Sequence, residues 1–228
     1  MTWKQMFTSS VGKKLVMSFT GIFLILFLIV HAGLNACIWA NDGGEMFNKA
    51  AHFMGGNWVP RILEVGLFAG LILHIVQGLM LESTNRKKRS TKYAVNYGNK
   101  GSKWYSRSMG ILGILILLFL ILHLSNFWLP NRSSQGLSLS GEIDLYAKMK
   151  ETFATHSPVT AITILVYVLG CAALGYHLAH GFQSAFKTLG VHNKKYQQML
   201  MAIGYVFSIV VCIAFAMMPL SFHFGWIS

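Results

Sequence analysis

The chain has 228 residues, of which 54% are hydrophobic and only 11% are charged, less than half the charged share of an ordinary soluble domain. This composition, with 16 Phe, 12 Met and 6 Trp, excludes a disordered chain, a coiled coil and a cytosolic globular domain. The formal net charge of +12 would suggest a nucleic-acid partner in a soluble protein. Membrane loops also collect Lys and Arg, so we expect a lipid bilayer and no nucleic acid as partner.

Five long uncharged stretches follow one another along the chain, each bounded by charged residues. A bilayer core needs about 20 apolar residues per helix, so each stretch accounts for one membrane span. The sequence therefore predicts an all-α membrane protein with five transmembrane helices, at about 15–41, 59–82, 108–130, 157–186 and 197–220. No linker interrupts the chain and no cleavable signal pattern opens it, so residues 1–228 are expected to form one mature integral-membrane domain.

Lys and Arg residues are distributed unevenly between the segments that join these spans. Alternate segments hold fourteen of them on one side and five on the other, and segment 82–107 alone holds eight. Cytoplasmic segments of membrane proteins carry the excess of positive charge, which predicts a cytoplasmic N-terminus and an external C-terminus. On the external side, residues 143–153 are a candidate short amphipathic helix.

Four of the nine histidines lie deep in successive predicted spans, and they are His31, His74, His123 and His177. Ionisable residues inside a membrane are costly and are therefore candidates for function. Measured from the cytoplasmic end at ~1.5 Å per residue, they form two layers, about 24–25 Å and about 12–15 Å deep. Two layers of two histidines fit two bis-histidine b haems in a helical bundle, with His31 and His123 in the outer layer and His74 and His177 in the inner layer.

Small residues recur at four-residue spacing around two of these histidines. They are Gly66, Gly70 and Gly78 around His74, and Ala173 and Gly181 around His177. Such a strip leaves room for a porphyrin beside the histidine. It is also typical of a face where two helices pack closely, so both interpretations stay open.

The fourth ligand has a competitor in the same helix. His180 lies one turn from His177 on nearly the same face, and its depth also suits the inner layer. Geometry alone leaves the choice open. The other four histidines, expected to be solvated or interfacial, are His52, His156, His192 and His223.

Five spans with one deep histidine in each of the first four resemble the type B dihaem cytochrome b membrane anchor of bacterial succinate:quinone oxidoreductase, the enzyme known as succinate dehydrogenase or fumarate reductase. The resemblance covers nearly the whole chain and includes the motif S-x-T-G at 18–21, upstream of His31. It also includes His74-x-x-x-Gly78, and His177-x-x-x-Gly181 followed nine residues later by Gly190. This register makes His177 the ligand, because His180 would place Ser184 where the family has glycine.

The resemblance implies a multi-pass protein of the bacterial cytoplasmic (inner) membrane, active in the respiratory chain and the tricarboxylic acid cycle. Such an anchor docks a flavoprotein subunit, which interconverts succinate and fumarate, and an iron–sulfur subunit. It passes electrons between the iron–sulfur subunit and menaquinone or ubiquinone through two b haems. The succinate chemistry belongs to the partner subunits, since this chain has no GxGxxG motif and no cluster ligands.

The resemblance also implies residues that hold the propionates of the inner haem near the cytoplasmic ends of the spans. They are Ser18, Trp104, Arg107 and Lys187, the last two of which are also explained as ordinary span-flanking charges. A branch of the family carries a proton-conducting glutamate two residues before the fourth ligand, where this chain has Gly175, so that route is not expected. Glu64, at the outer end of the second span, is a candidate proton acceptor for the quinone reaction, or an acid that merely reaches the interface.

Two other functions remain as alternatives, the first of them usually with a different spread of histidines over the helices. The first is a cytochrome b subunit of a hydrogenase or a formate dehydrogenase, which co-purifying subunits would distinguish. The second is a haem-free transporter or scaffold whose midplane histidines bind substrate or relay protons. A reduced-minus-oxidised optical spectrum would separate that alternative from both cytochromes.

Overall fold

The computed structural model describes residues 2, 7–87, 104–135 and 143–227, and these residues form helices joined by short loops. Five stretches are long and apolar enough to cross a membrane. They are Ser10–Ala40 (α2, Ser10–Ala36, with a 3₁₀ turn at Cys37–Ala40), α4 (Trp58–Lys87), Met109–Ser134 (which opens with α6, Met109–His123), α9 (Pro158–Thr188) and α10 (Lys194–His223). The predicted all-α fold with five spans is confirmed.

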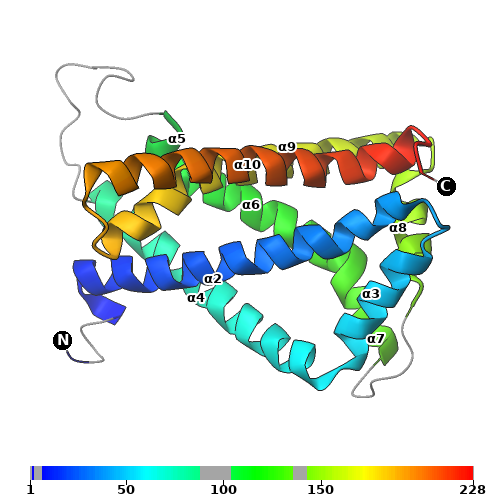
Figure 1. Cartoon of the computed structure of the whole chain (residues 1–228), viewed down its shortest axis with the longest axis horizontal. Coiled ribbons are helices and arrows are strands. Elements are labelled where there is room, and N and C mark those ends of the chain that lie inside the picture. Colours follow the sequence, from blue (N-terminus) through cyan, green and yellow to red (C-terminus); the bar gives the residue numbers. More distant parts are fainter. Residues whose placement is uncertain (1, 3–6, 88–103, 136–142, 228) are drawn as a thin grey trace.

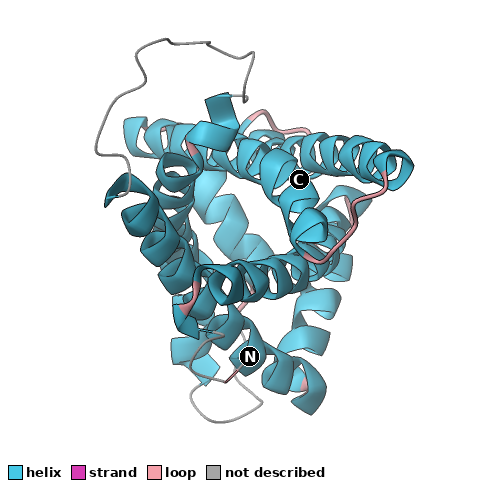
Figure 2. Ribbon diagram, turned by 90° about the vertical axis from the view of Figure 1, so that its left-hand side faces the viewer, coloured by secondary structure: helices cyan, strands magenta, loops and turns pink. Residues whose placement is uncertain are grey.

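The long helices run roughly along one axis and surround it, as the two perpendicular views show (Figure 1, Figure 2). The N-terminus and the short helix α5 (Trp104–Arg107) lie at one end, called here the N-terminal end. The C-terminus lies at the opposite end with α3 (Glu45–Gly56), α7 (Leu129–Gln135) and α8 (Leu145–Phe153). Helix α9 packs against α10, α6 and α2, and α4 packs against α2. Thus α2 and α9 join the other spans to one another.

Polar residues outside the apolar stretches define where the spans begin. The side chains of Ser9, Ser157 and Asn193 accept hydrogen bonds from backbone N–H groups in the first turns of α2, α9 and α10. These bonds satisfy donors that a helix leaves unpaired at its N-terminus. Pro158 adds a residue whose fixed φ suits the first helical position of α9.

Gly190 ends α9 in a left-handed backbone conformation, with φ of +99°. The Val191 N–H donates to the Phe186 carbonyl, and the Gly190 N–H donates to the Lys187 carbonyl. This pair of hydrogen bonds is typical of a helix that ends at a glycine. The residue after the C-cap then lies in the left-handed region of backbone conformation. Gly190, one of the glycines of the family motif, therefore has a backbone role at this position.

The third span changes its winding directly after His123. A π-helical turn (Leu124–Trp128) follows α6 and leads into α7, whose second residue is Pro130. Proline has no N–H to donate, and π turns of this kind are frequent at functional sites. The change therefore coincides with one of the four deep histidines.

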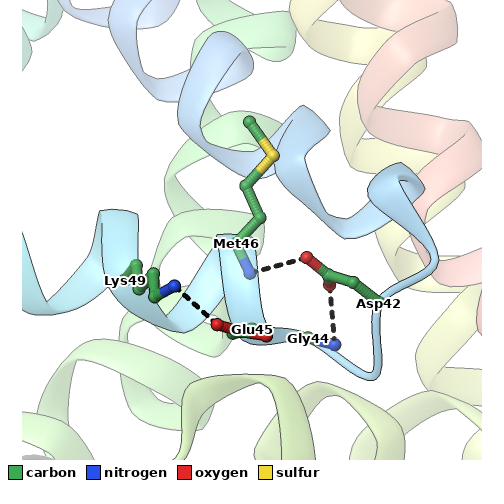
Figure 3. Close-up of polar contacts among 5 residues, drawn as sticks. All are labelled: Asp42, Gly44, Glu45, Met46 and Lys49. Atoms are coloured by element: carbon green, nitrogen blue, oxygen red, sulfur yellow. Dashed lines mark hydrogen bonds and ion pairs between the residues drawn. The ribbon is translucent and has the colours of Figure 1, made fainter.

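Two short helices, α3 and α8, cover the C-terminal end of the bundle. Asp42 caps α3 by accepting from the Gly44 N–H at 3.1 Å and the Met46 N–H at 2.9 Å, and Lys49 pairs with Glu45 one turn on (Figure 3). Helix α8 lies within the segment predicted to be an amphipathic helix, and begins two residues later than expected. Helix α3 was not predicted.

Helices α3 and α8 are joined by polar contacts between distant parts of the chain. The Asn48 amide donates to the Asp144 carboxylate at 2.8 Å, and Asp144 also accepts from the Ala147 N–H as the cap of α8. Both bonds lower the pKa of Asp144 from its ordinary value, and the bond from the Ala147 N–H has the larger effect. A side chain at Gly44 would collide with the Tyr146 ring, so glycine permits this close approach.

Candidate functional site

The four deep histidines meet as two pairs, each formed between two helices. His31 of α2 and His123 of α6 have ring centroids 5.8 Å apart, and His74 of α4 and His177 of α9 have centroids 6.3 Å apart. We call them the outer pair (His31 and His123) and the inner pair (His74 and His177). The structure brings together the same two pairs that the depth argument predicted.

Both separations suit a single metal ion held between two imidazoles. A metal–nitrogen bond of about 2 Å on each side, plus about 1 Å from each nitrogen to its ring centre, puts the centroids about 6 Å apart. Within the described residues, no three His, Cys, Asp or Glu side chains gather as a metal site. Haem iron, which brings four ligands of its own, needs only two histidines from a protein.

The Nδ1 atoms of the four rings have different surroundings. The Nδ1 of His74 lies 3.0 Å from the Thr20 hydroxyl, and that of His31 lies 3.4 Å from the Asn35 amide nitrogen. In the described part of the chain, the buried Nδ1 atoms of His123 and His177 have no hydrogen-bond partner. Buried polar atoms without partners are uncommon in proteins, so these two rings differ from His74, whose Nδ1 has a neighbour on another helix.

Aromatic side chains surround the outer pair. Phe27 stacks on His31 at 5.1 Å between centroids, and Phe119 stacks on His123 at 5.7 Å. The buried Tyr167 lies 6.2 Å from His123, and its hydroxyl accepts from Asn126 of the π-helical turn at 3.0 Å. The apolar rings keep water away from the outer pair, and the π-helical turn adds one polar contact beside it.

The small residues near the inner pair divide into two groups. A Cβ added at Gly70 would lie 3.1 Å from Phe23, and one added at Gly78 would lie 3.6 Å from Met17, both on α2. Only the approach at Gly70 is tight enough for glycine to permit helix packing, the alternative left open by the sequence, since the distance at Gly78 is an ordinary contact. At Gly66, which is exposed, and at Gly181, which is partly buried, an added Cβ would meet nothing within 4 Å.

The four residues expected near the propionates all lie toward the N-terminal end. Ser18 is buried, and its hydroxyl donates to the Lys14 carbonyl at 2.9 Å. Trp104 is exposed, and its ring lies 5.1 Å from that of Tyr176, the residue before His177. Arg107 and Lys187 are exposed at the ends of α5 and α9.

Glu64 has partners that the sequence did not reveal. Its carboxylate accepts from the Trp128 indole N–H at 2.6 Å and pairs with Arg132. These contacts link α4 to the π-helical turn and to α7. About three quarters of the Glu64 side chain is buried, so it does not simply extend into the interface.

The C-terminal end contains a cavity of about 520 Å³. Its lining residues are Lys150, Ala154, His156, Phe222, His223, Phe224, Gly225 and Ile227. The rings of His156 and His223 lie 4.9 Å apart, and the Nδ1 of His223 is buried without a described partner. Sequence reasoning missed this pair, since its members are 67 positions apart and come from a loop and a helix end.

Comparison with known proteins gives one distant similarity. Over 172 residues, 75% of this chain and 73% of the relative, the sequence is 27% identical to the succinate dehydrogenase cytochrome b558 subunit of Bacillus subtilis (strain 168). No family model matches the chain. No solved structure matches it either. The chain is thus a distant relative of a succinate dehydrogenase cytochrome b subunit, in line with the resemblance drawn from its histidines.

Proposed function

We propose that this chain is the membrane anchor and electron-transfer subunit of a succinate:quinone oxidoreductase. The observation that carries the proposal is the meeting of four histidines from four spans as two facing pairs. The distant similarity to a succinate dehydrogenase cytochrome b subunit supports it. In this role the chain carries electrons between an iron–sulfur subunit, itself joined to a flavoprotein, and membrane quinone.

Each histidine pair is proposed to hold one b haem, which supplies one-electron redox chemistry when bound. His31 and His123 serve the outer haem, and His74 and His177 serve the inner haem. The pairs come from helices that α2 and α9 hold in place, so the ligands are fixed by the packing of the bundle rather than by loops. From the sequence depths, the two pairs lie about 10 Å apart along the membrane normal.

The N-terminal end is the proposed docking side for the partner subunits. It carries Trp104, Arg107 and Lys187, together with Ser18 further in, which we propose face the propionates of the inner haem. Basic and indole N–H groups are suitable donors to carboxylates at an interface. The strongly basic segment 82–107 is part of this proposed docking side. Its residues 88–103 lie outside the part of the chain that the structure describes.

The C-terminal end is the proposed place of reaction with menaquinone or ubiquinone. Its cavity offers ring N–H groups from His156 and His223 and the ammonium of Lys150, which suit the carbonyl oxygens of a quinone. Glu64, at the same end, is the proposed acceptor of protons released when quinol is oxidised. Its ion pair with Arg132 gives it a structural role as well.

Alanine variants of the four histidines test the haem assignment in the purified complex. The wild-type complex should contain two protohaems per copy of this chain, measured as pyridine haemochrome. Each variant should lose one low-spin haem, because an axial position left vacant cannot keep iron low-spin. His74→Ala and His177→Ala should give one optical lesion, and His31→Ala and His123→Ala should give the other.

His180→Ala is the matched control, since it removes an imidazole one turn from His177 on the same helix. It should leave both haems low-spin. Loss of the inner haem in His180→Ala with its retention in His177→Ala would contradict the assignment of the fourth ligand. A wild-type complex without haem would contradict the proposed function and favour a transporter or scaffold.

A further inference from the structure

Thr20 is the side chain in contact with the ring of His74 from the neighbouring helix. It is buried in α2, with 9% of its surface exposed. Its hydroxyl oxygen lies 2.8 Å from the Val16 carbonyl oxygen and 3.0 Å from the His74 Nδ1. The contact joins residues 54 positions apart and bridges α2 and α4.

The hydrogen count of these groups links the directions of the two bonds. A threonine hydroxyl has one hydrogen, and a carbonyl oxygen can only accept. When the hydroxyl hydrogen lies in the shorter contact, to Val16, the Thr20 oxygen accepts from a protonated Nδ1 of His74. In this tautomer the lone pair of the neutral ring is on Nε2, the nitrogen then available to a metal.

We propose that Thr20 is a positioning residue for the inner haem, which fixes His74 in the tautomer that can ligate iron through Nε2. The inference rests on the proposed function, since it concerns the ligand of that haem. A hydrogen bond to the far nitrogen of a ligating histidine fixes ring orientation and makes the ligand more basic. A more basic ligand stabilises ferric iron, so Thr20 lowers the reduction potential of the inner haem.

The surroundings of His74 support this role. Gly21, the next residue on α2, would place a Cβ 3.6 Å from the His74 Cε1, so this face of α2 fits against the ring. The partner ring, His177, has no described hydrogen bond at Nδ1, so Thr20 supplies the hydrogen bond found for the inner pair. In the outer pair, Asn35 donates to the His31 carbonyl at 2.8 Å, and its 3.4 Å approach to Nδ1 is too long to fix that ring.

Three variants of the complete complex test the proposal. Thr20→Val removes the hydroxyl and keeps the shape, and Thr20→Ser keeps the hydroxyl and removes the methyl group. Thr163→Val is the matched control, because the Thr163 hydroxyl bonds to the Val159 carbonyl of its own helix and is exposed. Haem content is measured first, followed by optically monitored redox titration and by electron paramagnetic resonance of the low-spin ferric haems.

Thr20→Val should raise the midpoint potential of the inner haem and change its low-spin ferric signal, while the outer haem stays unchanged. Thr20→Ser should return both readouts toward wild type, and Thr163→Val should alter neither. Loss of the inner haem in Thr20→Val with retention in Thr20→Ser would also support the proposal.

An inner haem with wild-type potential and signal in Thr20→Val would overturn the assignment of Thr20. Loss of the inner haem in both Thr20 variants would overturn it too, because the hydroxyl kept in Thr20→Ser would then not hold the ring. A wild-type complex without two haems would instead refute the proposed function, and the haem count shows this before any variant is compared.

Discussion

His177 and His180 lie one turn apart on α9 and are equivalent as ligands by residue type and depth. The structure separates them by what each ring meets, since His177 faces His74 from α4. Among the described residues, no aromatic or imidazole ring faces His180 in this way. The spacing of glycines in the sequence favoured His177 over His180 as the fourth ligand. The packing of α4 against the rest of the bundle supports the same choice independently.

Glu64→Gln tests whether the ion-paired acid also accepts protons. The change keeps the shape of the side chain and removes its charge, so quinone-linked turnover should fall about 100-fold if this carboxylate is the proton acceptor. Haem content and potentials should stay as in wild type. Turnover is measured in the direction that oxidises quinol, with a soluble quinol as electron donor and fumarate as acceptor.

Glu82→Gln is the control for this change, because Glu82 lies at the other end of the same helix and pairs with Arg86. It should leave turnover near the wild-type value. If Glu64→Gln retains full turnover and only lowers the thermal midpoint, the ion pair with Arg132 is structural and the proton role is wrong.

At the scale of elements, the long apolar helices were readily predicted, and of the two short helices α8 was predicted and α3 was not. The five spans follow from the length of their uncharged stretches, and α8 follows from its amphipathic pattern. Helix α3 is at least as amphipathic as α8, so a local pattern does indicate it, and only the two glycines beside its start disfavour a helix there. Short helices gain their stability from tertiary contacts, and those of α3 include a bond from Asn48 to Asp144, 96 positions away.

Gly190→Ala and Gly181→Ala should separate a glycine needed by the backbone from one needed for space. Alanine at Gly190 must adopt the left-handed region, which costs about 1–2 kcal/mol, so the thermal midpoint should fall while both haem spectra stay unchanged. Gly181 has helical geometry and open space beside it, and alanine favours helices there.

If the space at Gly181 accommodates the proposed cofactor, Gly181→Ala should reduce the content of inner haem without a comparable loss of helix stability. Thermal unfolding in detergent and the haemochrome assay provide the two readouts. An altered inner-haem spectrum in Gly190→Ala at an unchanged thermal midpoint would show that the motif glycine acts on the cofactor rather than on the end of α9.

For the whole molecule, the depth of each histidine could be estimated from the sequence because a straight helix converts residue count into length. That single conversion placed His31 with His123 and His74 with His177, as the structure does. The contacts that hold the rings could not be found in this way. Thr20 meets His74 only through the packing angle of α2 and α4, which the apolar pattern of either helix does not specify.

The positions of the two termini provide a test of the orientation of the whole chain. They lie at opposite ends of the bundle, as an odd number of spans requires (Figure 1). The eight Lys and Arg residues of segment 82–107 predict that the N-terminal end lies in the cytoplasm, because cytoplasmic loops hold the excess positive charge. A reporter that works only in the cytoplasm should therefore be active when it is inserted in that segment. A reporter that works only outside the cytoplasm should be active when it is fused after Ser228. An insertion between 136 and 142 is the control, expected to agree with the C-terminal fusion. Reporters at 82–107 and after Ser228 on the same side would contradict five spans, and with them the assignment of an outer and an inner histidine pair.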